Sequence, residues 1–143
     1  MPARYKRGIS LRNSWEKQVL VSMQKRLRKT LDSLDIEQRE SLLRLLSTSG
    51  IVVSQLQDIE LPNTDLNNIN LQGADLSRSN LKNANLSQAN LKEASLKKAC
   101  LNGTSLTKAL LTGTVFQGAD MSDADLSDAD LSNADLSAFK FRL

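Results

Sequence analysis

The chain has 143 residues, one cysteine, no histidine and a formal net charge of +3. This length suits one domain, or one domain with a short appendage. A single cysteine excludes an internal disulfide and the lack of histidine argues against zinc, so a reducing, cytoplasmic setting is expected. The apolar runs are too short for a membrane span or a secretory signal, and neither is expected.

The net charge is divided unevenly along the chain. Residues 1–50 hold eleven Lys and Arg against five Asp and Glu, whereas residues 51–143 hold eight against eleven. Charge that segregates by region indicates a molecule in two parts, with differently charged surfaces.

Residues 1–10 form a basic N-terminal arm, and helical patterns begin at residue 11. Asn13 and Glu16 have the spacing of a capping box, with Asn in place of the usual Ser or Thr. The apolar residues that follow fall on one arc of a helical wheel: Trp15, Val19, Leu20, Met23, Leu27, Leu31 and Leu34. Basic residues fall on the opposite arc: Lys17, Lys25, Arg28 and Lys29.

A second helix is expected after Asp35, which is placed to cap it with Gln38 at the third position. The segment STSG, which ends at Gly50, has the composition of a helix stop. Together the patterns predict an α-helical hairpin over residues 11–50. Residues 51–58 then form a connector or a first partial coil.

From Leu61 onward an apolar residue occurs at every fifth position without a slip. The position two residues before each of these centres is small, most often Ala, and Asp, Asn or Ser usually lies between the two. The motif is therefore A-(D/N)-L-x-x. Its centres are Leu61, Leu66, Leu71, Leu76, Leu81, Leu86, Leu91, Leu96, Leu101, Leu106, Leu111, Phe116, Met121, Leu126, Leu131, Leu136 and Phe141.

A period of five matches neither regular secondary structure. On an α-helix five residues advance by about 500°, so successive leucines would form no stripe. On a strand, an odd spacing would place them on alternate faces. The centres share one interior only if the chain turns by a fixed angle every five residues, which describes a solenoid of stacked units.

The motif and its seventeen repeats resemble the pentapeptide-repeat proteins, over about residues 59–143. The resemblance implies a right-handed, four-sided parallel β-helix with one repeat per side and about four coils. In that fold each centre and the small residue two before it point inward. The rod would be roughly 20 Å long at the ~4.8 Å spacing of paired strands. Many members of the family come from cyanobacteria, which makes such a source plausible.

The hairpin is expected to cap the solenoid. An uncapped coil exposes unpaired backbone and apolar core, which favours edge-to-edge association. We therefore expect the apolar arc that begins at Trp15 to pack on the second helix and on the first coil. The basic arc remains available for an acidic protein, nucleic acid or anionic lipid.

The residues needed for catalysis are sparse. The chain has no histidine to act as a base, and its serines have no His/Asp arrangement to activate them. It contains no phosphate-binding glycine motif, and Cys100 is interpreted as a passive surface residue. We therefore expect a protein that is not an enzyme, with no cofactor and no metal.

The acidic run at residues 120–137 is interpreted as ordinary repeats. From Asp123 it begins like an EF-hand loop, but Asp128 occupies the glycine position and Ala134 the position of the bidentate Glu. The run also keeps its five-residue apolar centres, which argues against disorder. Its aspartates should form an acidic collar on all four sides of the last coil: Asp120, Asp123, Asp125, Asp128, Asp130 and Asp135.

Two further surfaces are candidate sites for partners. Leu110 and Val115 occupy positions that normally hold Asp or Asn, so they should point outward on adjacent sides. They indicate either a small apolar patch or noise in a degenerate repeat. At the C-terminus, Phe139, Phe141 and Leu143 can plug the last coil or form an end-to-end homodimer contact, as the resemblance implies for some family members.

These observations favour a non-catalytic module that binds, scaffolds or regulates an unidentified protein. The alternative is nucleic-acid binding through the basic residues 1–30. Some members of the family mimic DNA with long acidic rods. Here a belt of six bases in residues 78–108 interrupts the acidic surface, which argues against that role.

Overall fold

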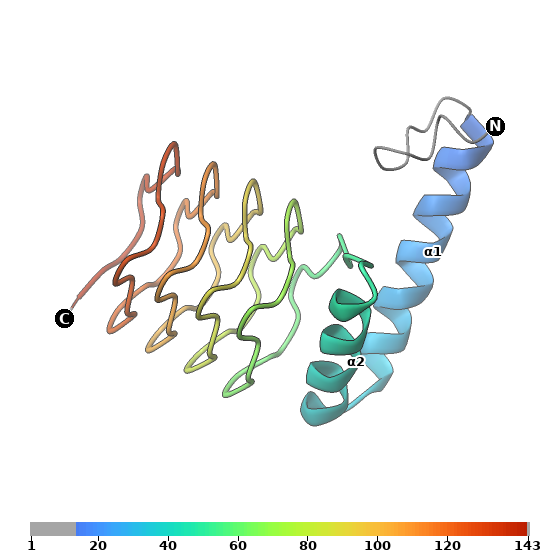
Figure 1. Cartoon of the computed structure of the whole chain (residues 1–143), viewed down its shortest axis with the longest axis horizontal. Helices are drawn as coiled ribbons and strands as arrows, with labels where there is room; N and C mark the ends of the chain where they lie inside the picture. The colour runs from blue at the N-terminus through green and yellow to red at the C-terminus, as the bar shows by residue number, and fades with distance from the viewer. Residues whose placement is uncertain (1–13, 143) are drawn as a thin grey trace.

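The computed structural model describes residues 14–142. It begins with two helices, α1 (Ser14–Ser33) and α2 (Ile36–Thr48), and residues 51–142 then form a stack of coils (Figure 1). The expected order, a helical hairpin followed by a parallel β-helix, is confirmed.

The coils pair with a fixed offset of twenty residues. Parallel bridges join each residue that precedes a centre to its equivalent in the next coil, from Gln55 and Asp75 to Asp120 and Lys140. On each side the backbone bonds run both ways. The Leu61 N–H, for example, donates to the carbonyl of Asn80 at 2.8 Å, and the Asn80 N–H donates to that of Ile59 at 2.9 Å. Twenty residues per coil and five per side are therefore the geometry of this chain.

A tight turn separates each side from the next. The residue two positions after each centre from Leu61 to Leu136 has a positive φ, as at Asn63 (57°), Gly73 (71°) and Lys98 (57°). This left-handed region is easy for Gly and tolerable for Asn and Asp, but it strains most other residues. Repeating the same turn at a constant spacing keeps all the centres on the inside.

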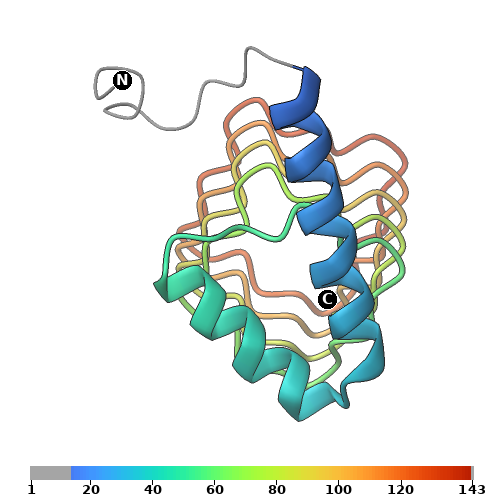
Figure 2. The ribbon, with the colours of Figure 1, turned by 90° about the vertical axis from the view of Figure 1, so that its right-hand side faces the viewer.

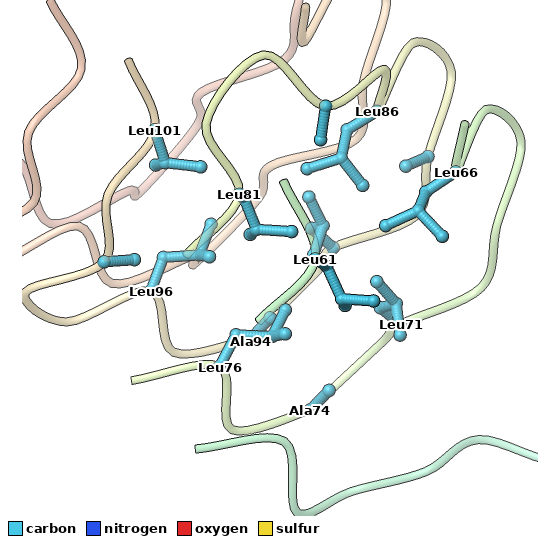
Figure 3. Close-up of a cluster of buried hydrophobic side chains, with 14 of the residues drawn as sticks. Leu61, Leu66, Leu71, Ala74, Leu76, Leu81, Leu86, Ala94, Leu96 and Leu101 are labelled. Carbon is cyan, nitrogen blue, oxygen red and sulfur yellow. The ribbon is translucent and has the colours of Figure 1, made fainter. Parts of the chain in front are cut away.

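The interior is filled by two kinds of side chain. Leucines from successive coils converge on the axis of the stack (Figure 3), and Leu66, Leu86 and Leu101 have no exposed surface. The small residues two positions earlier, such as Ala94, are equally buried. The core is thus continuous from the first coil until residues near the C-terminus become partly exposed.

The predicted signals that bound α2 are confirmed. The Asp35 side chain accepts the Gln38 N–H at 2.8 Å, and the Gln38 side chain accepts the Asp35 N–H at 3.1 Å, which completes a capping box. Gly50 follows the helix with a φ of +79°. The corresponding N-cap of α1, Asn13, lies outside the described residues.

The packing expected for the first half of α1 is wrong. Trp15, Val19 and Met23 are 61%, 50% and 52% exposed, whereas Leu31 is completely buried. The reason is geometric, because α1 and α2 diverge from the turn that joins them as they cross the end of the coil stack (Figure 2). The first half of α1 also leans away from the coils (Figure 1), so neither α2 nor the first coil covers this part of its apolar arc.

Polar side chains of the helices complete the cap. They satisfy backbone groups of the first coil that have no preceding coil to pair with. Arg39 donates to the Glu60 carbonyl at 3.1 Å, and Arg44 donates to the carbonyls of Asp65 at 2.6 Å and Asn67 at 3.2 Å. Further bonds of this kind join Arg28 to Gln57, Glu40 to Asp65, Ser47 to Asn70, and Gln24 to Val52 and Ser54.

We predict that Arg44→Met lowers the free energy of unfolding by about 1 kcal/mol, because it leaves two backbone carbonyls of the first coil without their donor. Urea denaturation followed by circular dichroism measures the change. Arg26→Met is the matched control, because Arg26 is exposed on α1, and its effect should stay within about 0.5 kcal/mol. Equal effects of the two substitutions would show that capping of the carbonyls contributes no stability.

Candidate protein-interaction surfaces

The basic residues predicted on the first helix separate into two groups. Lys17, Lys25 and Lys29 are exposed, as a partner-binding role requires. Arg28 instead turns toward the solenoid, where it bonds the Gln57 carbonyl and pairs with Asp32 at 2.9 Å. Arg28 therefore belongs to the cap and not to a free basic face, which corrects its predicted position on the outward arc.

The acidic run forms part of the β-helix. Four of its aspartates, Asp120, Asp125, Asp130 and Asp135, occupy successive sides, and each bridges to the equivalent residue of the preceding coil. Each accepts two bonds from the serine two residues later, as Asp125 does from the Ser127 N–H at 2.9 Å and hydroxyl at 2.5 Å. These donors lower the pKa of all four carboxyl groups, with the serine hydroxyl as the largest cause.

The remaining two aspartates lie at turns. Asp123 and Asp128 have positive φ values of 61° and 60° and are exposed. Sequence reasoning placed the six aspartates in one collar, but it missed that four of them also hold their own turns together. The available signal was the D-x-S spacing, which repeats four times between residues 120 and 137.

The basic belt lies one to three coils before the collar. Lys92 and Lys97 occupy the same sides as Asp130 and Asp135, and their charges contribute to the lowered pKa of those carboxyl groups. Arg78 is already paired with Asp58 at 2.9 Å. That pair is exposed, so it adds little stability. The surface therefore alternates between basic and acidic bands along the rod.

Leu110 and Val115 separate these bands. Leu110 is 38% exposed and bridges Asn90 in the preceding coil and Asp130 in the following coil. Val115 is half-buried on the adjacent side of the same coil. Cys100, which lies on a different side of the rod, is also half-buried, and its thiol donates to the Asn102 side chain at 3.2 Å.

The C-terminal coil is the least covered part of the solenoid. Phe139 and Phe141 remain 36% and 44% exposed, and their ring centroids lie 6.4 Å apart. The centres on the other three sides of this coil, Leu126, Leu131 and Leu136, are only partly buried. Leu143, predicted to share this end, lies outside the described residues.

Within residues 14–142, no three side chains of His, Cys, Asp or Glu are grouped to hold a metal ion. In the same part of the chain, no helix is long and apolar enough to cross a membrane.

Comparison with known families bears directly on the repeat. The family described as "Pentapeptide repeats" matches eight copies in overlapping segments at residues 54–88, 69–107 and 104–142, well over half of the chain. The chain belongs to the pentapeptide-repeat family. Among curated protein sequences, none matches it significantly.

Solved structures of pentapeptide-repeat proteins resemble it as well. Rfr23 from the cyanobacterium Cyanothece 51142 is 29% identical with a TM-score of 0.60, and the alignment covers 61% of this chain and 59% of that one. The chain therefore matches less than two thirds of that structure. The protein alr5209 from Nostoc PCC 7120 is 26% identical over 71% of this chain and 94% of that one, with a TM-score of 0.40.

The carboxylate–serine pairs predict a loss of stability in acid. Their pKa values are lower in the folded chain than the ordinary 3.8. The stabilising contribution is therefore fully present above about pH 4 and is lost as the pH falls through the lowered folded values. Thermal unfolding of the chain between pH 6 and pH 2.5 measures this loss.

The control is a chain with Ser127, Ser132 and Ser137 changed to Ala, which removes the hydroxyl donors and keeps the backbone donors. Its melting temperature should fall less than that of the unchanged chain over the acid range. Parallel curves for the two chains would refute a contribution from the hydroxyl bonds.

Proposed function

We propose that this chain is a non-catalytic interaction module that binds another protein and scaffolds or regulates it in the cytoplasm. The observation that carries the proposal is an interior filled by side chains, beneath an outer surface divided into charged bands. Such a surface suits recognition of a partner by charge and shape. Membership of a repeat family whose coils form extended outer faces supports the same conclusion.

Two surfaces are proposed to contact the partner. One is the exposed lysines of α1, which are Lys17, Lys25 and Lys29. The other is the band from Leu110 and Val115 to the collar of aspartates. One surface lies on α1 and the other on the coils of the β-helix. A partner with complementary charges can therefore bind either surface without a change in the backbone of this chain.

The test is quantitative capture of proteins from lysate of the source cells on the immobilised full chain. One variant carries Lys17→Glu, Lys25→Glu and Lys29→Glu. A second carries Leu110→Asp with Asp125, Asp130 and Asp135 changed to Asn, which keeps an acceptor at each turn. We expect at least one captured protein to fall by tenfold or more with one variant.

Gln88→Glu is the matched control, because it changes charge on an exposed turn outside both surfaces. Capture that is equal for the unchanged chain and for both variants would exclude these surfaces as the binding site.

Nucleic-acid binding through the basic N-terminal region is the second candidate. The exposed Lys17, Lys25 and Lys29, together with Arg26, favour it. Contacts to phosphates predict affinity that falls steeply with salt. Retardation of a 30-base-pair DNA or RNA duplex at ~50 mM salt, lost at ~300 mM, is the expected result. Free migration at ~50 mM would eliminate this candidate. A role as a DNA mimic is less supported, because Lys92 and Lys97 interrupt the acidic surface.

The C-terminal coil is proposed as an assembly surface. Its exposed Phe139 and Phe141 support an association between copies, as expected for a homodimer. Pairing two such ends would bring together two collars of six aspartates each, so like charges oppose that arrangement at low salt.

A further inference from the structure

The first half of α1 carries an apolar stripe with no partner in the described part of the chain. Trp15, Val19 and Met23 recur every four residues and fall within about 80° on the helix. Gln24, Arg28 and Leu31, which contact the connector and the first coil, lie on the far side of the helix. The stripe therefore faces away from the solenoid, as α1 itself lies in front of the coils in Figure 2.

Positive charge lies on one edge of this stripe. Arg26 continues the same line along the helix, Lys25 and Lys29 lie beside it on one edge, and Glu16 lies beside the other edge. Trp15, Val19, Met23 and Arg26 line one open depression. We call these residues together the head face. Two head faces would repel each other, so a partner for this surface should be acidic around an apolar centre.

The last coil has that chemistry. In the preceding coil the Leu106 N–H donates forward to the Asp125 carbonyl at 2.7 Å, and the Thr104 carbonyl accepts from Asp125 at 3.0 Å. Within residues 14–142 the equivalent groups of the last coil, the N–H groups of Leu126, Leu131 and Leu136 and the carbonyls of Ala124, Ala129 and Ala134, have no such partner. Unpaired edges of this kind favour association with another chain.

The apolar and charged groups of this coil complete the match. Its centres are only partly buried, and Phe139 and Phe141 are exposed beside them. Six aspartates surround this end, against Lys140 and Arg142. We call residues 124–142 with this collar the tail face. It is apolar at its centre and acidic at its rim, the complement of the head face.

The molecule already shows that a helix can cover an open coil. At the N-terminal end, Leu31 and Leu43 pack on the core while Arg39 and Arg44 donate to backbone carbonyls of the first coil. The outward side of α1 repeats this combination with its own apolar residues and with Arg26 and Lys29 as donors. One helix therefore has two sides suited to the same task.

We propose that the head face of one copy covers the tail face of a second copy, so that the chain associates head to tail. This goes beyond the proposed function, because it needs no second protein; a partner that binds Lys25, Lys29 or the collar competes with this contact. The contact is heterologous and leaves a free head and a free tail, so copies add in a row instead of closing as a pair.

The test uses two variants that each block one end at exposed positions. The head variant carries Trp15→Phe, Val19→Glu and Met23→Glu, and the tail variant carries Phe141→Asp. Sedimentation equilibrium at ~50 mM salt and up to ~500 μM chain measures the mass. The unchanged chain should exceed the mass of a dimer, and each variant alone should remain a monomer.

Mixing the two variants gives the decisive result. Each retains one working face, so a 1:1 mixture should form a dimer and nothing larger. The tail variant then contains the single tryptophan of the mixture, and its fluorescence should shift to the blue as Trp15 becomes buried. Raising the salt to ~500 mM should weaken the association at least tenfold, because charges at the rim are screened.

Val21→Glu is the matched control. Val21 is 45% exposed on a different side of α1, and its substitution should leave the mass of the chain unchanged. Circular dichroism checks that every variant is folded, and Phe139→Asp replaces Phe141→Asp if the latter is not.

Three results would overturn the proposal. An unchanged chain that stays monomeric at ~500 μM would exclude the contact. A head variant that dimerises alone would show pairing of tail with tail. A mixture in which both variants stay monomeric would show that the two faces do not bind each other.

Discussion

The whole structure depends on a left-handed turn after every side of the coil. Thirteen of the residues with a positive φ are not glycine, and they include Arg78, Glu93 and Lys98. Those that are neither Asn nor Asp each cost roughly 1–2 kcal/mol relative to an ordinary conformation. The cost is offset because the turn holds both neighbouring sides in register, where the backbone pairs and the leucines are buried. Without it the five-residue period would have no interior.

The two ends of the stack meet the same physical problem differently. A coil in the middle of the stack pairs its backbone N–H and carbonyl groups with the coils before and after it. The first and last described coils each lack one of these neighbouring coils. At the N-terminal end, Arg39, Arg44 and Glu40 supply side-chain partners. At the C-terminal end, serines donate hydrogen bonds to aspartates within the same coil. Among the described residues, no helix covers Leu131 or Phe141. Within the described residues, one end of the stack is therefore capped by helices and the other is partly exposed.

Sequence reasoning predicted the fold because the fold is periodic. Seventeen centres in register allow almost no other structure, and the capping residues Asp35 and Gln38 locate α2 by a local rule. The direction of the stripe at Trp15 was not predictable, because it depends on how far two helices diverge across a surface that forms elsewhere in the chain. Arg28 was misplaced for the same reason, since its acceptor at Gln57 lies 29 residues away. Assignment of the surfaces to partners stays a prediction, because charge bands describe a class of ligand and not its identity.

Because each motif forms one side of the coil, the number of motifs determines the direction in which the end of the chain points. Each added motif turns the end of the chain by a quarter of a revolution, and four motifs return it to the same orientation one coil further on. The bridges at a constant offset of twenty residues express this relation. The orientation of the C-terminal coil relative to α1 is therefore set by the number of motifs modulo four. Gain or loss of a single motif would re-aim one end of the molecule without altering either surface.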